Sequence, residues 1–218
     1  MKIIALTPGL LAGLLLTSCS FLDPIQTPNI QYYQLSVGNS GGNKPENTSD
    51  STLYIAPFNA DTPYDTRYLY ISGNHQLIQQ YNYYQWIAPP ATMLTNLIIS
   101  KTITAGIFQH VISGNIIGFA NYKLNGQLIR LSQITDQGKS AEIVLEMRLT
   151  LSDNTSGRII DTTTLSLKKP AGNNIDEDMD ITNTLANQLA DKVVLWLSDR
   201  LNRQPLKALK SPQKISPS

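Results

Sequence analysis

The sequence predicts a two-layer α+β fold, in which two amphipathic helices cover the apolar face of a mixed, mostly antiparallel sheet. Three runs between residues 122 and 167 alternate apolar and polar side chains, which is typical of half-buried antiparallel strands. Two other segments, one beginning near Pro90 and one near Asp176, repeat apolar residues at helical spacing. The apolar faces of such helices and of such a sheet are buried when the two layers pack together.

The chain after residue 30 begins with short predicted strands. Gln31–Val37 is the first, and Leu53–Ala56 is the second, which ends at Pro57 because proline cannot donate to a strand ladder. The polar residues 38–51 between them are expected to form a loop. Arg67–Ile71 and Gln76–Tyr81 flank the turn-forming sequence Ser-Gly-Asn, which predicts a hairpin.

A first helix is predicted over Pro90–Val111. Pro89 and Pro90 suit its start, where the missing N–H of proline would have no helical acceptor in any case. The β-branched run at Thr102–Thr104 opposes the assignment. The apolar residues that fall on one helical face are Leu94, Leu97, Ile98, Ile107, Phe108 and Val111.

The C-terminal half of the chain predicts an antiparallel meander followed by a second helix. The strands are expected at Tyr122–Leu131, Ile143–Leu151 and Ile159–Leu167, with Leu124, Gly126, Leu128 and Arg130 on one face of the first. Acidic residues at 176–180 mark the positive end of the helix dipole. The helix then presents an apolar stripe made of Ile181, Leu185, Leu189, Val193 and Leu197. Trp196 lies beside this stripe.

The N-terminus has the layout of an export signal. Lys2 precedes an apolar run from Ile3 to Leu16, which is too short to span a bilayer, and small residues follow. The tetrad Leu-Thr-Ser-Cys that ends at Cys19 resembles a bacterial lipobox, whose cysteine thiol accepts lipid. The alternative is an ordinary secretory signal with an incidental cysteine. Cys19 is the only cysteine in the chain and therefore has no disulfide partner.

These features divide the chain into four parts. We expect a signal peptide at residues 1–18, a lipid-anchored tether at 19–30, a folded domain at 31–203 and a disordered tail at 204–218. In lipoproteins of bacteria with two membranes, Asp after the cysteine resembles an inner-membrane retention signal. Ser20 stands there instead, which favours the periplasmic face of the outer membrane.

The residue types of catalytic and metal sites are sparse. The formal net charge is +1, which gives no field that would attract nucleic acid. His75 falls in a predicted turn and His110 near the end of the first predicted helix, and neither has metal-ligand spacing with another histidine or cysteine. No nucleophile elbow or phosphate-binding loop occurs in the sequence. We therefore expect a non-enzymatic protein without metal or cofactor, and an envelope hydrolase is the least favoured alternative.

Aromatic residues gather before the first predicted helix, as Tyr81, Tyr83, Tyr84 and Trp86. The tyrosines have two interpretations, packing beneath the helix start or contact with a partner, since aromatic residues are enriched in interface centres. For Trp86 core packing is favoured. Arg67 is interpreted either as an internal ion-pair partner or as an interface residue.

The order of several short motifs resembles the ABC-type transport auxiliary lipoproteins, the PqiC-like family. The match covers most of residues 31–203, and departs from the family where Ile87 separates Trp86 from Ala88. The motifs are Tyr32-Tyr33-Gln34-Leu35, Ile55-Ala56-Pro57-Phe58-Asn59-Ala60, Tyr64-Asp65-Thr66-Arg67, Gln85-Trp86-Ile87-Ala88-Pro89-Pro90 and a helix beginning near Met93-Leu94.

The resemblance implies a non-enzymatic outer-membrane subunit of a lipid-transport system. Its implied partners are an MCE-domain protein that bridges the periplasm and an ABC transporter permease in the inner membrane, and copies of the chain are expected to form a homo-oligomer. An alternative is a structural or assembly lipoprotein of another envelope machine, such as lipopolysaccharide export or secretin piloting, because one fold serves many functions.

Overall fold

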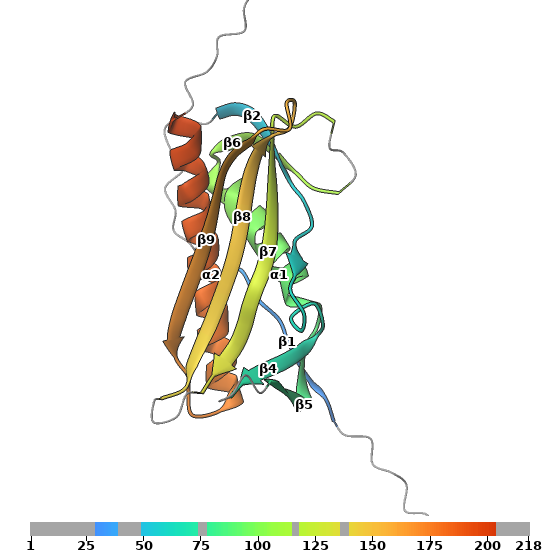
Figure 1. Ribbon diagram of the computed structural model, residues 1–218, viewed down its shortest axis with the longest axis vertical. Helices are drawn as coiled ribbons and strands as arrows, with labels where there is room; N and C mark the ends of the chain where they lie inside the picture. The colour runs from blue at the N-terminus through green and yellow to red at the C-terminus, as the bar shows by residue number, and fades with distance from the viewer. Residues whose placement is uncertain (1–28, 39–48, 74–77, 115–117, 136–139, 204–218) are drawn as a thin grey trace, which may run out of the picture.

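The structure is a computed structural model that describes residues 29–38, 49–73, 78–114, 118–135 and 140–203. The predicted signal peptide, Cys19, His75 and the tail lie outside the described residues. A nine-stranded mixed sheet is covered on one face by two helices, which confirms the predicted fold class (Figure 1).

Three long antiparallel strands form the main part of the sheet, as the alternating pattern predicts. They are β7 (Tyr122–Ile134), β8 (Glu142–Asp153) and β9 (Ile159–Pro170). The register of β7 against β8 shifts between Leu128 and Arg130. The prediction that Arg130 shares the face of Leu128 is therefore wrong, because the shift leaves Arg130 exposed and turns Leu131 into the core.

The second edge of β7 is shared by three short parallel strands. From the beginning of β7 to its end these are β2 (Ser49–Ile55), β3 (Asn59–Ala60) and β4 (Tyr68–Ser72). Further strands extend the sheet at both ends of this edge. The additions are β6 (Phe108–Ile112), parallel to β2, then β5 (Ile78–Trp86), antiparallel to β4, and β1 (Gln31–Tyr33), parallel to β5. The sheet thus branches at β7.

Two short strands have bounds that differ from the sequence prediction. β1 ends at Tyr33, earlier than predicted, and although Leu35 still packs against the core, Val37 is 52% exposed. β2 begins at Ser49, inside the predicted loop, because Ser49 and Thr52 already pair with β6. The predicted hairpin is confirmed as β4 and β5, although β5 continues to Trp86, beyond the predicted end at Tyr81.

The first helix is shorter than predicted. α1 runs over Pro90–Ala105 and ends at Gly106, whose φ of 64° is left-handed and whose N–H donates to the carbonyls of Thr102 and Ile103. The residues after it form β6, so the prediction of helix up to Val111 is wrong. His110 consequently lies on an exposed strand position, away from the helix terminus. Ile107 and Phe108 are buried as expected, but they reach the core from extended backbone.

The second helix, α2 (Ile175–Arg203), confirms the predicted apolar stripe. Leu185, Leu189, Val193 and Leu197 are fully buried, whereas Ile181 lies at the margin. Both helices lie behind the long strands in Figure 1 and pack against each other. The ammonium of Lys101 on α1 lies 3.1 Å from the carboxylate of Asp191 on α2. Neither helix of the described chain has the length and hydropathy needed to cross a bilayer.

Candidate functional site

The predicted tyrosine cluster lies on a small subsheet made of β4, β5 and β1, at one end of the molecule (Figure 1). Its geometry depends on an irregularity in β5. Tyr68 pairs with Gln85 and Tyr70 with Gln80, so two steps along β4 lie opposite five along β5. The extra residues bulge, and the inward positions of β5 no longer follow strict alternation. Tyr81 therefore shares the inner side of the subsheet with Tyr84.

The inner side is an aromatic layer beneath the start of α2. The ring centroids of Tyr81 and Tyr84 are 5.9 Å apart in an edge-to-face arrangement, and those of Tyr33 and Tyr84 are 6.1 Å apart. Trp86 is only 3% exposed, which confirms its expected packing in the core. Of the predicted contact residues, Tyr81, Tyr84 and Trp86 therefore pack inward.

Tyr33 joins this layer to the second helix. Its hydroxyl donates a 2.7 Å hydrogen bond to the carboxylate of Asp176 in the first turn of α2. Burial of the phenol, the hydrogen bond and the negative charge of Asp176 together raise the pKa of Tyr33 to about 12. The bond holds the short edge strand β1 against a helix that lies more than a hundred residues later in the chain.

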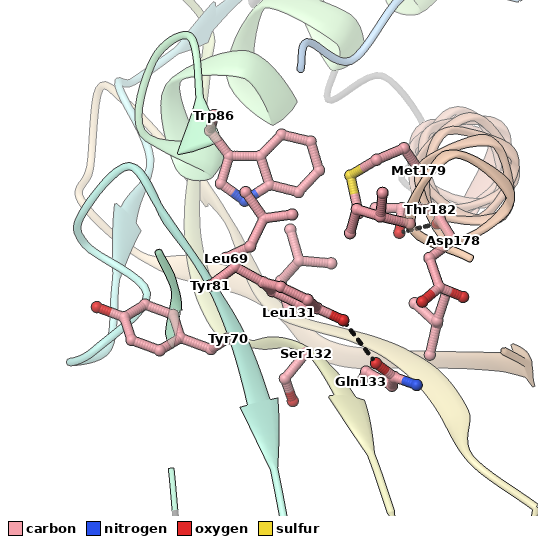
Figure 2. Close-up of a pocket in the computed structure, with 12 residues that line it drawn as sticks. Leu69, Tyr70, Tyr81, Trp86, Leu131, Ser132, Gln133, Asp178, Met179 and Thr182 are labelled. Atoms are coloured by element: carbon pink, nitrogen blue, oxygen red, sulfur yellow. Dashed lines mark hydrogen bonds between the residues drawn. The ribbon is translucent and has the colours of Figure 1, made fainter. Parts of the chain in front are cut away.

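A small cavity lies between this subsheet and the first turns of α2 (Figure 2). Leu69, Trp86, Leu131 and Met179 form its apolar wall. Its volume for water-sized occupants is about 30 Å³, which is room for about two water molecules and is far below the several hundred Å³ of an ordinary small-molecule site. A phospholipid acyl chain does not fit there.

Polar groups line the other side of the same cavity. Tyr81 donates a 3.1 Å hydrogen bond to the side-chain carbonyl of Gln133, as Figure 2 shows. The carboxylate of Asp178 is buried and accepts a 2.7 Å hydrogen bond from the N–H of Gly172. Burial raises the pKa of Asp178, and the charge of Glu177 adds to the rise, while the Gly172 N–H opposes it. The hydroxyl of Ser132 is buried and has no hydrogen-bond partner among the described residues.

Two asparagines on α2 hold the segment that follows β1. Asn183 accepts from the N–H of Ser36 at 2.9 Å. Asn187 donates to the carbonyl of Ser36 at 2.9 Å and accepts from the N–H of Gly38 at 2.7 Å. Their spacing of one helical turn matches an extended chain, and side-chain amides replace the missing strand partner. The sequence analysis missed both residues, although two asparagines four residues apart on a helix are a visible signal.

The outer side of the subsheet carries three exposed tyrosine rings and one exposed isoleucine. We call this set, which is Tyr32, Tyr68, Tyr83 and Ile87, the outer tyrosine face. Their exposed fractions are 54%, 39%, 54% and 55% respectively. Tyr83 is the one predicted tyrosine that points outward, and sequence reasoning missed its three neighbours because their shared side depends on register.

Arg67 is exposed at the margin of this face. Its backbone carbonyl accepts from the N–H of Trp86 at 2.7 Å, and its guanidinium has no ion-pair partner within the parts of the chain that the structure describes. An internal ion pair, one of the two interpretations of Arg67, is therefore not found there. The same parts of the chain contain no group of three or more histidine, cysteine or acidic residues that could hold a metal ion.

Solved structures share this fold, although no family model and no curated protein matches the chain. XCC0632 from Xanthomonas campestris, family-model DUF330, has a TM-score of 0.71 at 16% identity and covers 79% of this chain and 97% of its own. An uncharacterized protein has a TM-score of 0.62 at 13% identity, with coverage of 78% and 99%. The hypothetical protein CT253 from Chlamydia trachomatis has a TM-score of 0.50 at 8% identity, with coverage of 70% and 98%. The TM-scores establish a shared fold, and at identities this low they establish the fold alone.

Proposed function

We propose that this chain is a non-enzymatic lipoprotein of the bacterial outer membrane, lipid-anchored through Cys19. It serves as the docking subunit of an MCE and ABC-type lipid-transport system. Its folded domain faces the periplasm and receives the bridging MCE-domain protein, whose other end meets the ABC permease in the inner membrane.

Observations from the sequence and from the fold support the proposal. The lipobox-like tetrad ending at Cys19 and the motif order over residues 31–203 come from the sequence. The fold comes from the structure, and the family model given for XCC0632, DUF330, corresponds to the PqiC-like lipoproteins that the motifs resemble. The agreement between motif order and fold is the observation that carries the proposal.

The geometry favours a docking role over a lipid-carrying role. The cavity beneath the tyrosines holds about two waters, so lipid has no enclosed path through it.

Affinity purification from crosslinked membranes tests the proposal. The chain carries a C-terminal tag, and Cys19→Ser serves as the unlipidated control. We expect an MCE-domain protein and its ABC permease to be recovered with the wild type and to be depleted with Cys19→Ser. Recovery of a secretin or an outer-membrane barrel without an MCE protein would contradict the lipid-transport role and support the envelope-assembly alternative.

A further inference from the structure

We propose that the outer tyrosine face lies against the phospholipid headgroups of the membrane that holds the lipid anchor. The inference rests on the proposed anchoring at Cys19. It adds an orientation: the subsheet of β4, β5 and β1 faces the bilayer, and the opposite end of the long strands points into the periplasm.

Strand register places the exposed rings on one side. Tyr32 and Tyr68 both pair with Gln85, one from each neighbouring strand, and side chains of paired residues point to the same side of a sheet. Tyr83 and Ile87 flank Gln85 at two-residue spacing and are therefore on that side too. Their inward neighbours Tyr84 and Trp86 pack into the core. The four side chains thus form one continuous patch centred on Gln85.

The chemistry of the patch fits a headgroup layer. The described segments around it, residues 29–38, 68–73 and 78–100, contain no Asp, Glu, Lys or Arg. Tyrosine is enriched at the membrane–water interface, because its ring is apolar and its hydroxyl remains hydrated. Arg67 at the margin adds a positive charge next to phosphate groups. The middle of the long strands differs, since it exposes Arg148, which pairs with Gln127 of β7.

The position of the anchor agrees with this orientation. Asn29, where the described chain begins, lies two residues before Gln31, which pairs with Tyr84 of β5, so this part of the chain lies beside the subsheet. Cys19 precedes Asn29 by ten residues. A fully extended chain of that length spans at most about 35 Å. An acylated Cys19 therefore keeps the subsheet end within about 35 Å of the bilayer surface, close enough for direct contact.

Fluorescence quenching in vesicles tests the contact. Acylation blocks the thiol of Cys19, the only native cysteine, so a single introduced cysteine gives one labelling site. Lipidated full-length Tyr83→Cys and Ile87→Cys variants are labelled with an environment-sensitive dye. They are reconstituted in vesicles of phosphatidylethanolamine and phosphatidylglycerol that contain nitroxide-labelled lipid. The control is Ile159→Cys, at a residue of β9 that is 62% exposed.

We expect the nitroxide lipid to reduce the emission at positions 83 and 87 by about twofold or more relative to position 159, because a dye at the headgroup level lies close to the nitroxide and a dye at position 159 does not. An equal reduction of emission by the nitroxide lipid at all three positions, in protein that floats with the vesicles, overturns the orientation and leaves the anchoring intact. Protection of position 83 from aqueous iodide without quenching by the lipid also overturns it and indicates a protein partner or second copy. Absence of acyl mass on Cys19 overturns the anchoring itself, and the orientation with it.

Discussion

Tyr33 connects the first strand to the last helix through one hydrogen bond. The contact lies at the edge of the sheet, where a three-residue strand has little other support. Because the folded state raises the pKa of Tyr33 from 10.0 to about 12, the phenol stays protonated in the folded chain over a pH range in which it ionises in the unfolded chain. The contribution of this phenol to stability is therefore complete below about pH 10 and is lost as the pH rises towards 12.

Substitution of Tyr33 by phenylalanine tests this linkage. We expect Tyr33→Phe to lower the free energy of unfolding by about 1 kcal/mol near neutral pH, because the hydrogen bond to Asp176 is lost. The difference from wild type should shrink between about pH 10 and pH 12. Urea denaturation followed by circular dichroism measures both values. Tyr32→Phe is the control, and an undiminished difference at high pH would contradict the assigned pKa.

The sequence predicts the burial of individual aromatic side chains only in part. Trp86 was predicted in the core from its place before a helix start, and the structure confirms it. Tyr81, Tyr83 and Tyr84 carried no signal that separates inward from outward positions. That separation is set by the bulge of β5, which depends on the pairing with β4 and is not encoded in residue type alone.

The close approach of β7 to the segment between β2 and β3 depends on one glycine. A Cβ atom at Gly126 would lie 2.6 Å from the ring of Phe58, which is buried and fixed by the hydrogen bond of its N–H to Thr95. We expect Gly126→Ala to lower the free energy of unfolding by about 1–3 kcal/mol through overpacking. Thermal or urea denaturation measures this change.

Gly118→Ala is the control for that substitution, since nothing lies within 4 Å of a Cβ there. The double variant Gly126→Ala with Phe58→Leu should be less destabilised than the sum of the two single variants, because the smaller side chain makes room. Additive losses would show that the ring does not limit position 126.

The segment after β1 depends on α2 for its hydrogen bonds. Asn187→Ala removes the acceptor of the Gly38 N–H and the donor to the Ser36 carbonyl. We expect amide hydrogen exchange at Gly38 to accelerate by about fivefold, which corresponds to about 1 kcal/mol. Gln188→Ala, on the exposed side of the same helix, should leave that rate unchanged. Equal exchange in both variants would mean that the asparagine does not hold the segment.

Elements with strong periodicity were predictable, and elements set by long-range pairing were not. The meander of β7, β8 and β9 and the stripe of α2 follow from alternation and helical spacing. β6 was mistaken for helix because Ile107, Phe108 and Val111 also fit a helical face. Its β-branched residues and the preceding Gly106 were the opposing signals, and parallel pairing with β2 decides the outcome.

At the scale of the whole molecule, the proposed location depends on the proposed acylation at Cys19. We expect a clickable fatty acid fed to cells to label the wild-type chain and to leave Cys19→Ser unlabelled, because serine has no thiol to accept the diacylglyceryl group. Ser20→Ala, which changes the next residue, should retain the label. In-gel fluorescence after immunoprecipitation measures this, and label on Cys19→Ser would contradict the assignment of the anchor.

The branching of the sheet at β7 has a consequence for how the chain matures. Leu53 of β2 pairs with Tyr122 of β7, which lies 69 residues later in the chain. β2, β3 and β4 all add to the same late-arriving edge, so none of the three has its central neighbour until β7 has been made. The apolar residues 53–55 have no such neighbour until β7 joins the sheet. An unfolded chain therefore benefits from a chaperone that shields its N-terminal third before β7 pairs.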